Sequence, residues 1–146
     1  MSTNNEAMIS IKHTFHINAP IAKVYEALTT IEGLSEWWTR DTVGNFELGD
    51  CIYFTFGEHA TFEFQVALLN ENKLVNWKFE GGYPDWDGTF VAFIMSEQNG
   101  LTRMEFVHEE FEDDYEGYGN INFSWAGYLS SLRDYCETGK GKPFSE

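Results

Sequence analysis

The sequence predicts an α+β fold in which a curved antiparallel sheet surrounds a long C-terminal helix. Two observations support this. Apolar residues recur at helical spacing over about 121–138, namely Ile121, Trp125, Tyr128, Leu129, Leu132, Tyr135 and Cys136, a pattern typical of an amphipathic helix. Most of the chain before this helix alternates apolar and polar residues, as β-strands do. The helix would be roughly 27 Å long at ~1.5 Å per residue, long enough to bury its apolar stripe along the sheet.

The first part of the chain predicts one strand and two short helices. Residues 1–7 are polar, and we expect a disordered tail there. Residues 8–17 alternate and predict a half-buried strand. Asn18 is a suitable N-cap and Pro20 suits a first helical turn, so a helix is expected to follow. Thr30 predicts the N-cap of a second short helix.

Six further strands are predicted between the short helices and the long one. They cover 43–48, 51–57, 60–69, 74–79, 89–96 and 101–108. Within 60–69, alternation places Phe62, Phe64, Val66 and Leu68 on one face. Residues 80–88 are rich in Gly, Pro and Asp and predict a loop. The acidic residues 109–119 predict a mobile loop before the final helix.

Composition restricts the class of protein. A length of 146 residues is typical of one domain, which we expect over 8–146. The net charge of −15 provides no basic surface for nucleic acid or for anionic lipid. No segment resembles a signal peptide or a membrane span. Cys51 and Cys136 fit a reducing compartment, so we expect a cytoplasmic protein without membrane insertion.

Three stretches of the chain resemble one known family. They are FHINAPIAKVYEALTTIEGLSEWW (15–38), LTRMEFVHEEF (101–111) and SWAGYLSSLRDYCETGKGKPF (124–144). In this order they are similar to the activator of heat-shock protein 90 ATPase homologue family, within the START-like or Bet v-type (SRPBCC) superfamily of helix-grip folds. The resemblance implies a pocket between the sheet and the long helix, and it suggests a chaperone as a partner. That activator has two domains and this fold corresponds only to its C-terminal part, so we rank the chaperone role below ligand binding.

The candidate ligand-binding residues are mostly aromatic. They are Trp37, Phe54, Phe56, Phe62, Phe64, Trp77, Phe106, His108, Trp125 and Leu129. An aromatic content of 17% favours bulky, rigid pocket walls, although a filled core explains the same residues equally well. His108 alternates with apolar residues, and the resemblance places it toward the cavity. There a neutral imidazole would orient a polar group of the ligand.

No sequence motif indicates a metal, a cofactor or a catalytic site. The chain contains no phosphate-binding loop, nucleophile elbow or HExxH pattern. The acidic runs 85–88 and 113–116 lack the spacing of a calcium-binding loop. Glu63 becomes a candidate acid or base only if the two faces of its strand are exchanged. We therefore predict no metal and no cofactor, and we assign no catalytic residue.

Three functions remain open at this stage. The leading prediction is a small cytoplasmic protein that binds a small hydrophobic or amphipathic molecule between the sheet and the C-terminal helix. The second is a cyclase-like or hydrolase-like enzyme that uses the same pocket, with His13 or His108 as acid or base. The third is a chaperone interaction protein, as the family resemblance implies.

Overall fold

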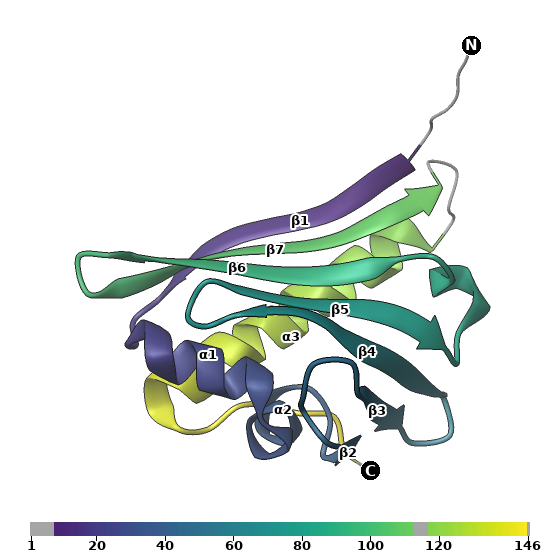
Figure 1. The fold of residues 1–146 in the computed structure, drawn as a ribbon, viewed down its shortest axis with the longest axis horizontal. Helices are drawn as coiled ribbons and strands as arrows, with labels where there is room; N and C mark the ends of the chain where they lie inside the picture. The colour runs from purple at the N-terminus through teal and green to yellow at the C-terminus, as the bar shows by residue number, and fades with distance from the viewer. Residues whose placement is uncertain (1–7, 113–116, 146) are drawn as a thin grey trace.

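A seven-stranded antiparallel sheet curves around one long helix in the computed structural model, which describes residues 8–112 and 117–145 (Figure 1). The strands are β1 (Met8–Ile17), β2 (Asp41–Gly44), β3 (Cys51–Phe56), β4 (Ala60–Asn70), β5 (Leu74–Gly81), β6 (Phe90–Gln98) and β7 (Leu101–Glu112). The helices are α1 (Ile21–Thr29), α2 (Ile31–Trp37), the short 3₁₀ helix η1 (Pro84–Trp86) and α3 (Tyr118–Thr138). The predicted tail 1–7 and residues 113–116 of the predicted acidic loop lie outside the described residues.

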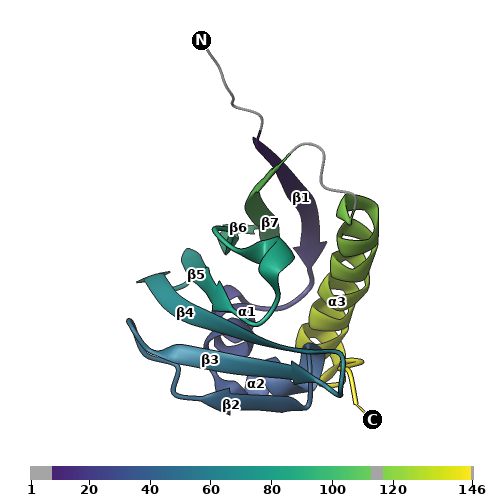
Figure 2. The ribbon, with the colours of Figure 1, turned by 90° about the vertical axis from the view of Figure 1, so that its right-hand side faces the viewer.

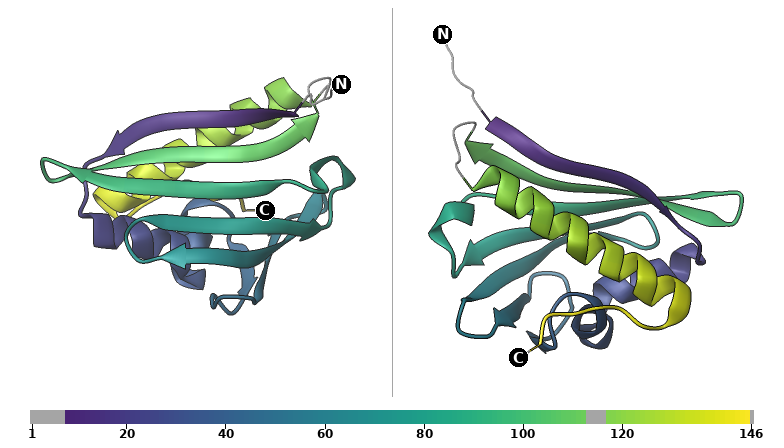
Figure 3. Two further views of the ribbon diagram at one scale, coloured as in Figure 1. Left: turned by 45° about the horizontal axis from the view of Figure 1, so that its top comes forward. Right: turned by 180° about the vertical axis from the view of Figure 1, so that it is seen from behind.

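The order of the strands in the sheet is β1-β7-β6-β5-β4-β3-β2. Helix α3 crosses the concave face of this sheet diagonally. Helices α1 and α2 cover the same face near the C-terminal end of α3 (Figure 3). Figure 2 shows the sheet curling so that its two edges approach the helix from different sides. The predicted α+β fold is confirmed, with its order of strand, two helices, six strands and long helix.

Of the two N-caps predicted from the sequence, the structure confirms one. The predicted cap at Thr30 is confirmed, because its Oγ1 accepts a hydrogen bond of 2.9 Å from the Gly33 amide. Helix α3 ends before Gly139, whose φ of 86° is a left-handed C-cap. The prediction of Asn18 as an N-cap is wrong, because Pro20 occupies the cap position of α1. The Asn18 amide instead donates to Glu137 Oε2 at 2.7 Å and so ties this segment to α3.

Three strand predictions need correction. The predicted strand 43–48 is β2, Asp41–Gly44, and residues 45–48 lie outside it. Strand β7 continues to Glu112, so residues 109–112 of the predicted mobile loop belong to the sheet, where Phe111 and Glu112 pair with β1 and Glu109 pairs with Phe90 of β6. In β4 the register shifts between Val66 and Leu68, as a β-bulge does. Because one extra residue reverses the alternation, Leu68 is 55% exposed rather than on the face it was predicted to share with Phe64.

The core lies between the concave face of the sheet and the three helices. Every second residue of β7 from Thr102 to His108 is fully buried, as alternation predicts. Trp38 follows α2 and lies at the centre of a group of aromatic rings. Its ring stacks on Trp77 at 6.0 Å and on Trp125 at 5.1 Å between centroids. The core therefore joins the sheet to α3 through indole rings.

Candidate functional site

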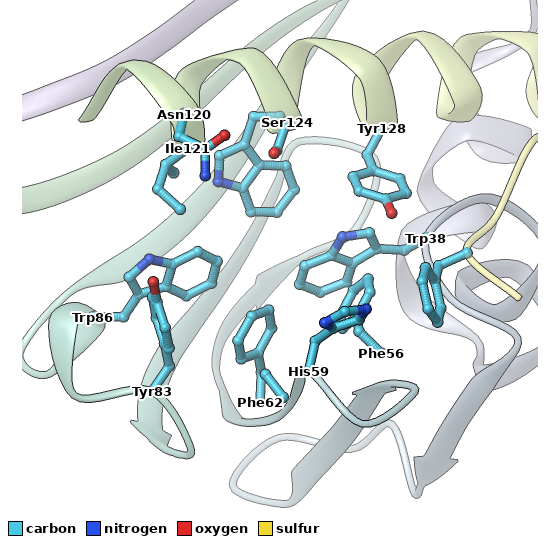
Figure 4. Close-up of a pocket in the computed structure, with 13 residues that line it drawn as sticks. Trp38, Phe56, His59, Phe62, Tyr83, Trp86, Asn120, Ile121, Ser124 and Tyr128 are labelled. Atoms are coloured by element: carbon cyan, nitrogen blue, oxygen red, sulfur yellow. The ribbon is translucent and has the colours of Figure 1, made fainter. Parts of the chain in front are cut away.

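A pocket of about 390 Å³ opens between α3 and the sheet, with η1 at one side (Figure 4). The helix contributes Asn120, Ile121, Ser124, Trp125 and Tyr128. The opposite wall consists of Trp38, Phe56, His59, Ala60, Phe62, Tyr83, Trp86 and Phe144. The pocket is therefore lined mainly by aromatic rings, with a few polar side chains among them.

Helical periodicity explains which residues of α3 face the pocket. Asn120, Ser124 and Tyr128 are spaced four residues apart, as are Ile121 and Trp125, so the two rows lie side by side on one face. Trp125 is 2% exposed and packs toward the sheet, whereas Asn120 and Ser124 lie near solvent. This face of α3 therefore changes from apolar to polar across the pocket mouth.

The C-terminal segment supplies one more wall. The Phe144 amide donates to the Trp38 carbonyl at 2.8 Å, and the Arg40 amide donates to the Phe144 carbonyl at 3.0 Å. This pairing holds the Phe144 ring 5.5 Å from the ring of Phe56. A residue of the C-terminal segment thus reaches a pocket whose sheet wall comes from β3 and β4.

The sequence-predicted site residues separate into two groups. Phe56, Phe62 and Trp125 line the pocket. The others do not line it and are buried in the core, at 0–3% exposure: Trp37, Phe54, Phe64, Trp77, Phe106, His108 and Leu129. Leu129 borders a smaller groove of about 170 Å³ on the other side of α3, together with His13. Glu63 lies on the outer face of the sheet, where the Tyr53 hydroxyl is 3.4 Å from its Oε2.

Sequence reasoning missed the lining residues that come from turns and chain ends. Trp86 and Tyr83 lie in the segment predicted as a loop, and His59 lies in the β3–β4 turn. A large apolar residue within a Gly-, Pro- and Asp-rich loop was the available signal, because an indole in such a loop needs a surface to cover. Trp38 lies one residue beyond α2, where helical phase no longer predicts its direction.

Beneath the pocket, His108 links two of its tryptophan walls. The Trp125 indole N–H donates to His108 Nδ1 at 3.1 Å. An indole nitrogen only donates, so Nδ1 accepts and the ring proton is on Nε2, which donates to Thr89 Oγ1 at 3.0 Å. The Thr89 hydroxyl in turn donates to the Trp86 carbonyl at 2.6 Å. A buried chain of hydrogen bonds therefore runs from Trp125 to Trp86.

His108 is held in its neutral form. It is fully buried, and this burial lowers the pKa of its imidazole to about 3. The Trp86 ring meets the imidazole edge-on, with centroids 4.7 Å apart and an interplanar angle of 88°. A neutral imidazole that donates once and accepts once fits this position, so His108 supports the pocket walls from behind.

The other ionisable groups near the site give no metal centre. No cluster of three or more His, Cys, Asp or Glu side chains suited to a metal ion occurs among the described residues. Both cysteines are free thiols.

Burial raises the pKa of the Tyr128 hydroxyl, which therefore remains a neutral phenol in the pocket. In the described part of the chain, no helix has the length and hydrophobicity needed to cross a membrane.

The curved sheet, the long helix across it and the pocket between them define the START-like, helix-grip class. Residues 18–137 match the family described as activator of Hsp90 ATPase homolog 1-like protein, so the chain belongs to that family. A comparison with curated proteins gives no match.

Solved structures support this assignment. The chain is similar to the Aha1 dimer from Colwellia psychrerythraea, with 35% identity, 91% of this chain and 99% of that chain covered, and a TM-score of 0.84. A protein from Staphylococcus saprophyticus has 18% identity over 92% of this chain and 97% of its own, with a TM-score of 0.77. A protein from Mesorhizobium loti has 18% identity over 86% and 95%, with a TM-score of 0.75. The last two likenesses show the fold alone.

Proposed function

We propose that residues 8–146 act as one cytoplasmic domain that binds a small hydrophobic or amphipathic molecule in the pocket between α3 and the sheet. The observation that carries this proposal is the pocket itself. Its volume of about 390 Å³ is within the usual range of small-molecule sites, ~300–1,000 Å³. Its walls are aromatic, with few polar groups, as such sites commonly are. Of the ten predicted site residues, Phe56, Phe62 and Trp125 enter this proposal as pocket walls, and the other seven are core residues.

The packing around the pocket favours a binding site over a filled core. The rings that line and back it are in close contact, such as Phe62 and Trp86 at 4.5 Å and Phe106 and Trp125 at 4.5 Å. The space in front of them is not filled, although Tyr83 and Tyr128 border it. An apolar space of this size that opens to solvent between close-packed rings is typical of a small-molecule site.

The test uses a substitution that fills the pocket without touching the core. Ser124 lies on the exposed side of α3 and lines the pocket, so Ser124→Trp should place an indole in it. Ser130 lies on the same helix outside this pocket, and Ser130→Trp is the matched control. We expect Nile red, an uncharged dye, to bind the wild type and the control with Kd on the order of 1 μM, about −8 kcal/mol. Ser124→Trp should lose this binding.

Native mass spectrometry of protein from its own host provides the second readout. A retained small molecule should appear with the wild type and with Ser130→Trp, and it should be absent from Ser124→Trp. If Nile red binds all three proteins equally, the dye does not occupy this pocket and the proposal is wrong.

The geometry gives less support to the enzyme alternative. His108 does not line the pocket, and His13 lies on the other side of α3, where its Nε2 is 2.9 Å from Asn122 Oδ1. His59 lines the pocket, but its imidazole makes no hydrogen bond to another described side chain that would orient it. General acid–base catalysis needs a positioned proton donor or acceptor. The described residues therefore favour binding without turnover.

Contact with a chaperone is the second candidate function, and the family match favours it. The Colwellia psychrerythraea relative, described as Aha1, covers nearly the whole chain at 35% identity. The test is ATP hydrolysis by a purified heat-shock protein 90 with and without this protein. A rise in rate that saturates with protein concentration would support the role, and an unchanged rate together with no co-purification would exclude it.

A further inference from the structure

Few residues of the pocket lining can carry a charge. Among the described residues that line it, none is Asp, Glu, Lys or Arg, and His59, exposed in the β3–β4 turn, is the one imidazole. Tyr128 stays neutral because burial raises the pKa of its hydroxyl. A charged ligand group in this pocket would lose its hydration without gaining an ion-pair partner from the described lining, which is costly. The net charge of −15 further disfavours anions near the protein.

The polar groups of the pocket lie mainly along one wall. Asn120, Ser124 and Tyr128 follow one another along α3, and at about 1.5 Å of rise per residue their Cα atoms are roughly 6 Å apart along the helix axis. Figure 4 shows the hydroxyls of Ser124 and Tyr128 pointing from the helix toward the opposite rings. None of the three side chains makes a hydrogen bond to another described residue, so their donors and acceptors are available to a ligand.

The aromatic rings of the pocket have mixed orientations. The rings of Trp38 and Phe56 differ by 68°, and those of Tyr83 and Trp86 differ by 86°. The indole planes of Trp86 and Trp125 differ by 19°, and those of Trp38 and Trp125 differ by 28°. These three indoles are covered by neighbouring rings, with only 2–3% of each exposed, so they give the pocket a rigid apolar backing.

We infer that the pocket selects an uncharged, apolar ligand that carries a hydroxyl or carbonyl group on the edge facing α3. This inference rests on the proposed ligand-binding function and adds the chemical class of the ligand. Ser124 and Tyr128 determine the specificity, because their hydroxyls point into the pocket and have no protein partner among the described residues. The surrounding rings provide the apolar contact.

The first test compares four molecules that share a flat double ring and differ in one substituent. They are 2-naphthalenemethanol, 2-methylnaphthalene, 2-naphthoate and 2-naphthylmethylammonium, and each competes with Nile red bound to the wild-type protein. The alcohol should bind about 2- to 12-fold more tightly than the hydrocarbon, the range expected for one net hydrogen bond. It should bind at least about tenfold more tightly than either ion, because each ion must be desolvated without a charged partner.

The second test removes the hydroxyls and keeps the shape of the pocket. In the double variant Ser124→Ala/Tyr128→Phe, the alcohol should lose its advantage over the hydrocarbon, while the hydrocarbon should bind as it does to the wild type. Ser130→Ala is the matched control on the same helix and should retain the advantage. Circular dichroism at 25 °C establishes that all three proteins are folded.

The outcomes separate this inference from the proposed function. If Nile red binds but the carboxylate or the ammonium ion competes as well as the alcohol, the pocket is a ligand site and the uncharged class is wrong. If the double variant still binds the alcohol more tightly than the hydrocarbon, the α3 hydroxyls do not contribute to ligand selection. If Nile red fails to bind the wild type, the proposed function falls and this inference falls with it.

Discussion

The two ends of α3 differ in what they pack against. The C-terminal half places Leu132 and Cys136 in the core, at 0% and 1% exposure, and contacts α1 and α2. The N-terminal half has Asn120 and Ser124 near solvent and Ile121 only partly buried above the pocket. One amphipathic helix therefore serves stability at one end and leaves room for a ligand at the other. Trp125 lies between the two halves and contributes to both.

Of these variants, Trp125→Ala should lower the free energy of unfolding most, because Trp125 packs in both halves of α3. Truncation of a buried Trp costs about 3–5 kcal/mol of unfolding free energy. It also leaves His108 Nδ1 without the indole donor that it accepts from, which adds to the cost. Urea unfolding measures the change, and Phe123→Ala, at a side chain 79% exposed on the same helix, is the control. Equal stability of the two variants would show that Trp125 does not join α3 to the sheet.

Leu132→Ala tests the packed half alone. A fully buried Leu replaced by Ala costs about 2–5 kcal/mol, since a cavity remains where the side chain was. Because Leu132 does not line the pocket, Nile red affinity of the folded variant should stay within about twofold of wild type. A large loss of affinity at a temperature where the variant is folded would mean that the two halves of α3 are coupled.

His108, which lies beneath the pocket, should make the free energy of unfolding depend on pH. Burial lowers the pKa of the folded His108 imidazole to about 3, below its ordinary value of 6.5. Between these values the unfolded chain binds a proton that the folded chain excludes, so stability falls as pH decreases from 6.5 toward 3, by about 1.4 kcal/mol per pH unit. His108→Gln removes this titration, so the stability of the wild type relative to the variant should decline with that slope.

Unfolding free energies at pH 7, 6 and 5 provide the measurement, with Ser130→Ala as a reference that keeps His108. If the wild type and His108→Gln lose stability in parallel, His108 is not held neutral in the folded protein. If the wild type instead gains stability relative to His108→Gln as the pH falls, the imidazole is protonated in the folded protein.

Ile121→Ala should have the smallest effect on stability. This side chain is only partly buried and lines the pocket, so we expect a loss of about 1 kcal/mol, below that of Leu132→Ala on the same helix. Nile red binding should nevertheless weaken, because apolar contact with the ligand is lost. Thermal unfolding and dye titration of the two variants side by side would sharpen the difference between the halves of α3.

The sequence predicted the elements well where the pattern was local. Every second residue of β7 points inward as the alternation of Thr102, Met104, Phe106 and His108 predicts, and α3 buries the stripe that its spacing predicts. The prediction failed at Leu68, where a bulge reverses the alternation, and at Asn18, which is tied to Glu137 instead of capping α1. Leu68 depends on its pairing with Asn76 on the next strand, and Asn18 depends on Glu137 in α3. Periodicity within one element contains neither partner.

For the candidate site, the sequence by itself determined that aromatic residues and His108 face inward, because the alternation of apolar side chains defines a face. Only the tertiary structure decided which of these rings border open space. Phe54, Phe64 and Trp77 are covered by other rings, whereas Trp38, Trp86 and Phe144 reach the pocket from a helix end, a loop and the C-terminal segment. A cavity is the volume that several distant segments fail to fill, so it follows from their relative placement and not from the pattern of any one of them.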